Sequence, residues 1–208
     1  MKSQEAYAAI RDIIIKADPN ESVPYSENYF AEVLGMSRTP IRAALQQLQY
    51  DGLINIIPHQ GIVIRGISYE EAWQLFDLRK LVETYLFERS AGKLTTDELD
   101  VLDKMIRTQK EMLDRGDYEA FIDDDLDFHF FMYRHYDNPQ MKKIVMNYKD
   151  RLYRSRLRSL SQEKRAEKSI RDHYQMVQLL REKKQDEAFR VFKNHIITLE
   201  SIFKKGSF

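Results

Sequence analysis

The sequence predicts a mainly α-helical protein, in which a short N-terminal segment ending in a β-hairpin precedes an all-helical antiparallel bundle of about six helices. Three observations lead to this fold class. The 208-residue chain has only 7 glycines and 5 prolines, too few for a fold rich in turns. Apolar residues recur at helical spacing along most of the chain. The pattern changes character near residue 67, which predicts two domains, residues 1–67 and residues 68–208.

The first domain is predicted to contain three short helices and a hairpin. Apolar residues at helical spacing predict a helix over residues 4–16, and a second helix is expected over residues 27–34. A third helix begins after Ser37, a favourable capping residue, and reaches about Tyr50. Two β-rich runs, LINII and IVIR, follow, and the four residues Pro58–Gly61 between them predict a hairpin turn. This order is that of a winged helix-turn-helix, a DNA-binding fold.

Six long amphipathic helices are predicted after residue 67, and the short loops between them favour an antiparallel bundle. Their expected bounds are about 68–90, 95–116, 118–136, 138 onward, 162–183 and 186 to just before 206. Ser68 and Glu71 have the spacing of a capping box at the start of the first of these helices.

The composition excludes several classes of protein. Lys+Arg and Asp+Glu are both 33, so the net formal charge is zero and any contact with nucleic acid must use a local patch. The absence of cysteine excludes disulfides, thiolate zinc sites and cysteine nucleophiles. No apolar run is long enough for a signal peptide or a membrane span, so we expect a cytoplasmic protein without a membrane partner.

The third predicted helix has one apolar face and one polar face. Its apolar residues recur at helical spacing and predict a buried stripe of Ile41, Ala44, Leu45 and Leu48. Arg38, Thr39, Arg42 and Gln46 fall on the other face. Arginine can form two hydrogen bonds to guanine and glutamine can pair with adenine, so this face is suited to reading bases. An ordinary solvated face is the alternative, and the adjoining wing favours DNA binding.

Charge counts predict that DNA binding requires a dimer. Residues 1–67 hold six Lys/Arg and seven Asp/Glu, while residues 36–66 hold three Arg and one Asp. The positive charge is therefore local, and one such domain is a weak electrostatic partner for DNA. We expect a homodimer on a palindromic operator, because twofold symmetry doubles the contacts and predicts inverted half-sites.

Three of the five histidines occupy inward positions on separate predicted helices. Asp125 and His129 lie four residues apart on one helix face and can bind the same ion. His173 and His195 are each flanked by apolar residues at helical spacing. A hydrogen-bonded core histidine is the usual explanation for any one of them, whereas a metal site accounts for the set, and both remain open from chemistry alone. His135 is expected near the surface, on another face of the same helix as His129.

The segment LGMSRTPIRAALQQLQYDGLINIIPHQGIVIR resembles the DNA-binding segment of GntR-type bacterial transcription regulators, whose usual pattern is close to LGVSRTPVREALxxLxxEGLVxxxPxRGxxV. The resemblance implies that six residues of the recognition helix and wing tip lie at double-stranded operator DNA: Arg38, Thr39, Arg42, His59, Gln60 and Gly61. Asn28, in SENYFA, stands where the family often has arginine in a SERELA-like run.

Residues 68–208 are similar to the FCD-type effector domain of the FadR-like subgroup of GntR regulators. The matching features are FDLRKLVE, then DLDFHFFMYRHYDNP, then one histidine on each of the last two predicted helices. The metal-binding branch of this subgroup uses one aspartate and three histidines, and it implies four metal ligands here: Asp125, His129, His173 and His195. These ligands suit zinc, nickel or manganese.

The same resemblance implies a small carboxylate effector at the open positions of the metal. Arg79 is the expected charged partner of that carboxylate, through two parallel hydrogen bonds. An intrahelical pair with Glu83, four residues further on, is the alternative role for Arg79.

The sequence therefore predicts a bacterial, ligand-responsive, DNA-binding transcription regulator that is not an enzyme. Two alternatives are a metal-sensing regulator, in which the ion itself is the signal, and a metalloenzyme with an Asp/His site. Residues 142–168 form a basic run with ten Lys/Arg and three Asp/Glu. A solvated helix face explains this run, and contacts to the effector from Arg154 or Arg158, or to DNA phosphates, are the alternatives.

Overall fold

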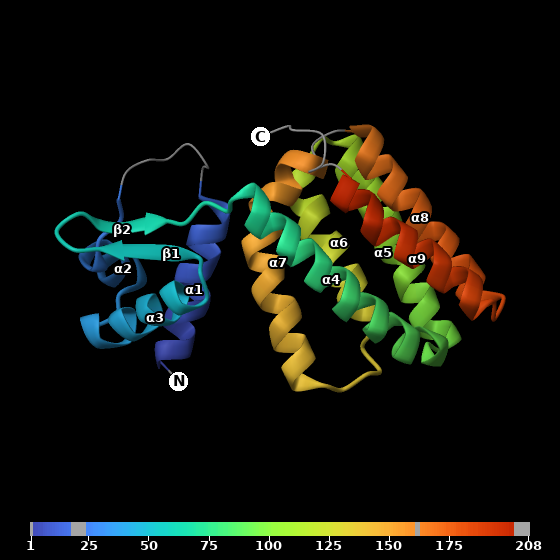
Figure 1. Cartoon of the computed structure of the whole chain (residues 1–208), viewed down its shortest axis with the longest axis horizontal. Helices are drawn as coiled ribbons and strands as arrows, with labels where there is room; N and C mark the ends of the chain where they lie inside the picture. Colours follow the sequence, from blue (N-terminus) through green and yellow to red (C-terminus); the bar gives the residue numbers. More distant parts are fainter. Residues whose placement is uncertain (1, 18–23, 161–162, 202–208) are drawn as a thin grey trace. The chain divides into compact units, whose positions relative to one another are not determined.

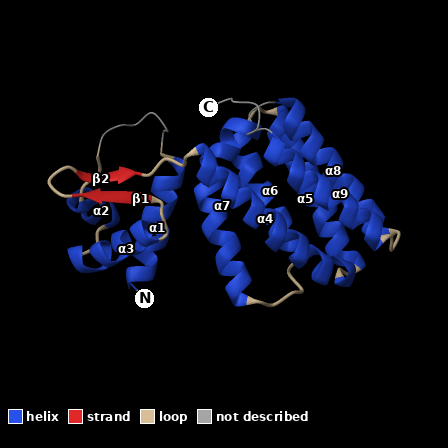
Figure 2. Cartoon of the chain, in the orientation of Figure 1, coloured by secondary structure: helices blue, strands red, loops and turns tan. Residues whose placement is uncertain are grey.

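The structure, a computed structural model, describes residues 2–17, 24–160 and 163–201, without the side chains of residues 69, 154–163 and 198–201. Helices make up most of the described chain, and the two strands form one hairpin (Figure 2). The mainly α-helical fold class is thus confirmed.

The described residues form two compact units. One unit runs to Ser68 and also includes Lys149–Arg154, and the other begins at Tyr69. The sequence predicts a change of domain after residue 67, and it gives no sign that residues 149–154 group with the first unit.

The first unit has the element order of a winged helix-turn-helix (Figure 1). Its elements are α1 (Lys2–Lys16), α2 (Glu27–Leu34), α3 (Arg38–Tyr50), β1 (Ile54–Ile57) and β2 (Gly61–Ile64). Ser26 begins α2, because its side chain accepts a hydrogen bond from Tyr29 N at 3.0 Å. Gly35 ends α2 with a left-handed φ of 60°. Ser37 precedes α3 as predicted, but its side chain makes no capping hydrogen bond.

All five elements contribute apolar side chains to the core of this unit. The core consists of Ala6, Ile10, Ile14, Phe30, Ile41, Ala44, Leu45, Leu48, Leu53, Ile54 and Ile62. The predicted buried stripe of α3 is part of this core, so the opposite face of α3 is turned to solvent.

The wing is a two-stranded antiparallel sheet in which Ile54 pairs with Ile64. Tyr25 extends it by one bridge, since Tyr25 N donates to Ile62 O and Ile62 N donates to Tyr25 O, both at 2.8 Å. Gly61 has a φ of 108°, and a Cβ there would lie 2.7 Å from Tyr25 O. Glycine at position 61 is therefore required by the backbone, whatever its role at DNA.

Six long helices follow Ser68, as the sequence predicts, and they belong to the second unit except for Lys149–Arg154. They are α4 (Tyr69–Ser90), α5 (Thr96–Asp114), α6 (Tyr118–Met132), α7 (Pro139–Leu160), α8 (Glu163–Arg181) and α9 (Gln185–Ser201), with a short 3-10 turn, η1 (Ala91–Lys93), after α4. α5 packs against α6 and α8, and α9 packs against α8 and α4 (Figure 1). Thr95 begins α5 with a capping box to Glu98.

One predicted helix is too long. The helix expected over about 118–136 ends at Met132, because the backbone N–H of His135 donates to Ser90 Oγ at 3.0 Å instead of continuing the helix. Asn138 then begins α7, since its side chain accepts from the backbone N–H groups of Gln140 and Met141.

The core of the bundle comes from α4, α5, α6, α8 and α9. Its buried residues include a stacked pair of rings, Phe87 and Phe192, whose centroids lie 4.3 Å apart. A few polar side chains are buried beside this apolar core, and the candidate site consists of them. None of the described helices is long and apolar enough to span a membrane.

Candidate functional site

The predicted DNA-facing residues lie on one helix face and on the wing tip. Arg38, Thr39, Arg42 and Gln46 are exposed on α3. His59 and Gln60 are exposed at the tip of the wing, where Gly61 is half-buried. These side chains are therefore accessible to a ligand, and their contact with DNA remains a prediction.

Arg42 has a partner that the sequence analysis does not predict. Its Nε and one terminal nitrogen donate to the two carboxylate oxygens of Glu27 on α2, at 3.1 and 2.9 Å. The hydrogen bond from Arg42 lowers the pKa of Glu27, and the pairing raises the pKa of Arg42. This side-on contact leaves the terminal edge of the guanidinium available, and that edge has the geometry to pair with guanine.

The four predicted metal ligands come together in the bundle. Asp125 and His129 lie on α6, His173 on α8 and His195 on α9, and all four residues are buried. One ligand atom from each lies within 4.8 Å of those of the other three. The prediction that these positions point inward is confirmed.

The histidine side chains meet through their Nε2 atoms. His129 Nε2 lies 3.2 Å from His195 Nε2, and His173 Nε2 lies 3.5 Å from Asp125 Oδ1. Asp125 Oδ1 also accepts a hydrogen bond from Ser169 Oγ at 3.1 Å. Three ring nitrogens and one carboxylate oxygen therefore converge on one small volume.

Each histidine has an outer hydrogen-bond partner at its other ring nitrogen. His129 Nδ1 donates to Glu83 Oε2 at 3.1 Å. His173 Nδ1 donates to Gln109 Oε1 at 2.9 Å, and His195 Nδ1 donates to Asp172 Oδ2 at 3.3 Å. In a neutral ring, a proton held at Nδ1 leaves the lone pair of Nε2 facing the cluster, as a metal ligand requires. Burial lowers the pKa of His195 to about 4, so this ring is neutral at pH 7.

Arg79 of α4 is 2% exposed, and it is connected to this cluster because Arg79 and His129 both hydrogen-bond to Glu83. Its Nε donates to Glu83 Oε1 at 2.7 Å, and the other oxygen of Glu83 is the partner of His129. The two terminal nitrogens of Arg79 have no hydrogen-bond partner among the described residues. The predicted pair with Glu83 is therefore present and occupies only one edge of the guanidinium.

A buried guanidinium with two unsatisfied nitrogens is costly, because each buried donor that loses water without gaining an acceptor destabilises the fold by about 1–3 kcal/mol. The fold compensates part of the charge with Glu83. Burial by itself raises the pKa of Glu83, but Arg79 and His129 outweigh it and hold that pKa well below its ordinary value. Glu83 is therefore ionised, and an anionic ligand that accepts from Arg79 would satisfy the remaining donors.

One neighbouring prediction changes in detail, and another falls outside the described structure. His135 lies in the turn after α6, not on that helix, and its Nε2 lies 2.7 Å from Glu98 Oε2. His135 therefore lies near the surface, as expected, and is not part of the histidine cluster. Arg154 and Arg158, the possible effector contacts of the basic run, have side chains outside the described part of the structure.

The outer partners of the histidines are not predicted from the sequence. Gln109 occupies a buried position in an otherwise apolar stripe of α5, with Leu102, Ile106 and Leu113. A single amide on such a stripe is a usable signal, because a buried polar group needs a partner. Tyr148 on α7, whose hydroxyl donates to Glu83 Oε1 at 2.8 Å, has no comparable signal, since a tyrosine is also an ordinary core residue.

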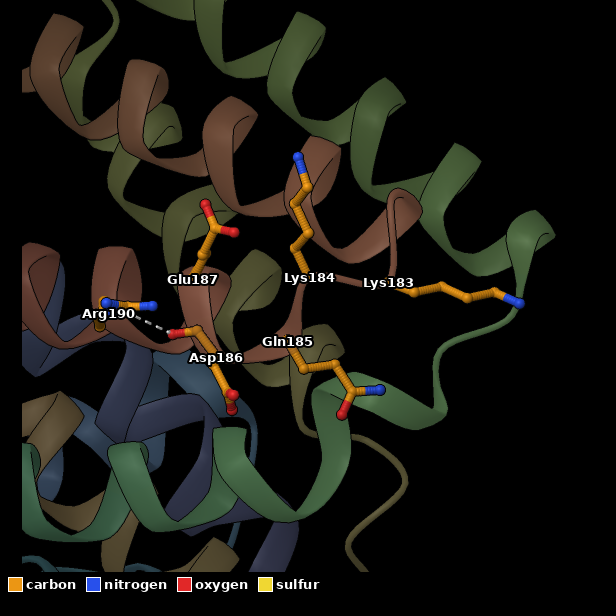
Figure 3. A pocket seen from close by; sticks show the side chains of 6 residues that line it. All are labelled: Lys183, Lys184, Gln185, Asp186, Glu187 and Arg190. Carbon is orange, nitrogen blue, oxygen red and sulfur yellow. Dashed lines mark hydrogen bonds between the residues drawn. The ribbon is translucent and has the colours of Figure 1, made fainter.

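A pocket of 460 Å³ lies at the turn between α8 and α9 (Figure 3). Its lining is polar and consists of Lys183, Lys184, Gln185, Asp186, Glu187 and Arg190. The side chains of Lys183 and Lys184 extend in different directions, and Arg190 Nε donates to the backbone oxygen of Asp186 (Figure 3). The pocket contains no member of the histidine cluster, so it is not the predicted effector site.

Known families match both parts of the chain. Residues 74–198 match the FCD domain, and residues 2–64 match the bacterial regulatory proteins of the gntR family. The transcriptional repressor RspR of Escherichia coli (strain K12) is 24% identical over 93% of this chain and 85% of its own length. The gluconate operon transcriptional repressor of Bacillus licheniformis is 32% identical over 60% of this chain and 51% of its own length.

Solved structures share the fold. McbR/YncC of E. coli has a TM-score of 0.82 at 17% identity, covering 99% of this chain and 98% of that chain. A GntR regulator from Rhodococcus sp. RHA1 has the same TM-score and coverage at 16% identity. The FCD match spans more than half of the chain, and the relatives are transcription regulators, not enzymes. The chain therefore belongs to the GntR family of bacterial DNA-binding transcription regulators and has an FCD effector domain.

Proposed function

We propose that this regulator changes its affinity for operator DNA when a small carboxylate binds beside a divalent metal ion in the helical domain. The observation that carries the proposal is the pair of unsatisfied terminal nitrogens on buried Arg79. They lie on a side chain that shares Glu83 with His129, one of the four converging ligands. A cation site and an anion anchor are therefore neighbours.

The donor set fits a divalent ion. The Nε2 atoms of His129 and His195 lie 3.2 Å apart, a separation at which both could bind one cation in place of a shared proton. Three imidazole nitrogens and one carboxylate oxygen suit zinc, nickel or manganese. Asp125, His129, His173 and His195 would hold the ion, and the ion would supply positive charge for an anionic ligand.

Arg79 fits a carboxylate as the anionic ligand. A guanidinium offers two parallel N–H groups to the two oxygens of a carboxylate, and burial strengthens such charge-assisted bonds. Because Arg79 is buried, we infer that the carboxylate is small.

DNA binding is assigned to the exposed face of α3 and to the wing tip. The contact residues we propose are Arg38, Thr39, Arg42, Gln46, His59, Gln60 and Gly61. The first 67 residues carry one more acidic than basic residue, so we propose a homodimer that presents two such surfaces to a palindromic operator. A carboxylate changes operator affinity only if it binds more tightly to one arrangement of this dimer than to another.

Operator binding by chelator-treated protein tests the proposal. The DNA is the intergenic segment upstream of the protein's own gene, and binding is followed by fluorescence anisotropy with zinc, nickel or manganese and a panel of small carboxylates. We expect a carboxylate to change operator affinity only in the presence of metal, and not in Arg79→Ala. A metal that gives the full response without any carboxylate would identify a metal sensor, and no response to either would contradict the proposal.

A further inference from the structure

We propose that Glu83 is a positioning residue that links the metal site to the carboxylate site, by fixing the tautomer of His129 with one oxygen and the orientation of Arg79 with the other. This inference rests on the proposed function and names the side chain that couples its two ligands. Glu83 is 3% exposed, and its partners come from α4, α6 and α7.

Both carboxylate oxygens of Glu83 act as acceptors. Oε2 accepts from His129 Nδ1 at 3.1 Å. Oε1 accepts from Arg79 Nε at 2.7 Å and from the Tyr148 hydroxyl at 2.8 Å. A side chain with three donors divided between two oxygens must be a carboxylate, because an amide has an acceptor at only one of the two positions.

The bond to His129 determines which nitrogen of that ring carries the proton. An ionised carboxylate cannot donate, so the ring must donate from Nδ1, and in the neutral ring that leaves the lone pair on Nε2. That Nε2 is the atom that lies 3.2 Å from His195 Nε2, within the cluster. Glu83 therefore holds His129 in the only neutral form that can ligate a metal from this position.

The bond to Arg79 determines which edge of the guanidinium remains available. Glu83 occupies Nε, and the two terminal nitrogens lack hydrogen-bond partners in the described part of the chain. The planar guanidinium is thus held by its Nε edge, which leaves the two terminal nitrogens as donors for a ligand. One side chain prepares both sites, so the occupancy of either site changes the environment of the other through Glu83.

The other two outer partners differ from Glu83 in a way that permits a test. Gln109 accepts a hydrogen bond from His173 with its amide oxygen. Asp172 accepts hydrogen bonds from both His195 and Lys168 with the same oxygen, Oδ2, at 3.3 and 2.5 Å. An amide at position 172 can direct its single oxygen to both donors, whereas an amide at position 83 cannot satisfy donors on both sides.

Glu83→Gln and Asp172→Asn are therefore matched variants, each replacing one carboxylate with an amide of the same shape. In Glu83→Gln the amide oxygen remains at Arg79 and Tyr148, where two donors lie, and its NH2 group faces His129. The ring of His129 must then accept at Nδ1 and carry its proton on Nε2, where it blocks metal binding. In Asp172→Asn the proton of His195 stays on Nδ1.

Two measurements on the full-length protein test this inference. Calorimetric titration of Zn²⁺ into chelator-treated protein should give an affinity about tenfold to a hundredfold weaker for Glu83→Gln than for the wild type, with a smaller loss for Asp172→Asn. Long-range ¹H–¹⁵N spectra of the metal-free protein should place the His129 proton on Nδ1 in the wild type and in Asp172→Asn, and on Nε2 in Glu83→Gln.

The outcomes separate this inference from the proposed function. A wild-type chain that binds no Zn²⁺, nickel or manganese contradicts the proposed function and the inference with it. A wild type that binds Zn²⁺ no more tightly than Glu83→Gln, or equal losses in the two variants, overturns the role of Glu83 alone. If Glu83→Gln does not fold, the wild-type spectrum still decides, because a His129 proton on Nε2 contradicts the inference.

Discussion

The two parts of the chain each contain an arginine paired with a glutamate, and the two pairs differ in burial. Arg42 and Glu27 are paired at the surface of the winged unit, with side chains 62% and 34% exposed. Arg79 and Glu83 are paired inside the bundle, with side chains 2% and 4% exposed. An exposed pair contributes little to stability and can be exchanged for another partner, whereas a buried pair is strongly destabilising to break.

This difference suits the partners that we propose for the two arginines. DNA is large and approaches from solvent, so the side chains that would meet it are exposed and have solvent-accessible partners. A small carboxylate is enclosed, and its anchor must already be buried and oriented before the ligand arrives. An arginine–glutamate pair therefore provides an exchangeable contact when it is exposed, as in the winged unit, and a fixed anchor when it is buried, as in the bundle.

Breaking the buried pair is expected to have the largest effect. Arg79→Met leaves the Glu83 carboxylate buried without its guanidinium, and we expect the free energy of unfolding to fall by about 3–5 kcal/mol. Denaturant unfolding of the metal-free protein measures this loss. Arg42→Met is the matched control, and it should leave the unfolding midpoint unchanged because that pair lies at the surface. Similar losses in the two variants would remove the distinction between the pairs.

Metal binding is expected to stabilise the helical domain by a comparable amount. A ligand that binds only the folded state stabilises it by about 4 kcal/mol at a free concentration a thousandfold above its dissociation constant. Thermal unfolding with and without added Zn²⁺ measures this gain. The gain should largely disappear in His195→Ala and persist in His135→Ala, whose histidine pairs with Glu98 outside the cluster. A chelator that leaves the melting temperature of freshly purified protein unchanged would contradict the metal site.

Removal of the exposed arginine should act on DNA binding and not on stability. Arg42→Ala should weaken binding to the operator by about 5- to 150-fold, the range for loss of one base-reading side chain, and should change binding to random DNA far less. Anisotropy titrations on both DNAs give the ratio. Equal losses on the two DNAs would reassign Arg42 to a phosphate contact.

The smallest effect on DNA binding is expected from a change of Glu27, the partner of Arg42. Glu27→Gln removes a negative charge beside the DNA-facing surface and one oxygen acceptor from Arg42. Affinity for random DNA should increase slightly, because a negative charge is removed. The ratio of operator affinity to random-DNA affinity should fall, because Arg42 loses its fixed orientation. Competition between operator and random DNA measures the preference. An unchanged preference would mean that Glu27 does not orient Arg42 for base recognition.

The winged unit could be predicted closely because its signals are local. The spacing of Ile41, Ala44, Leu45 and Leu48 predicts which face of α3 is buried, and so which face is exposed. The ion pair of Arg42 escapes prediction, because Glu27 is fifteen residues away and only the packing of α2 on α3 brings the two together.

The buried site could be predicted only in part. Apolar flanks place His173 and His195 inward, and the four-residue spacing joins Asp125 to His129 on one helix face, whereas the four-ligand set follows from the resemblance to the FCD domain. Glu83 could be recognised as a neighbour of Arg79 from its spacing, but not as the partner of His129, from which it is separated by 46 residues. The end of α6 at Met132 depends on Ser90, also distant in sequence. Contacts of this kind are set by tertiary packing.

The most direct test of the central proposal is native mass spectrometry, with metal analysis, of protein purified from its own host. We predict a mass corresponding to a dimer with one divalent ion per chain, together with a small co-purified acid that is absent from Arg79→Ala. Protein that carries no metal and no ligand, and whose melting temperature and operator affinity are unaffected by zinc, nickel or manganese, would contradict the proposal. Asp125, His129, His173 and His195 would then be hydrogen-bonded core residues.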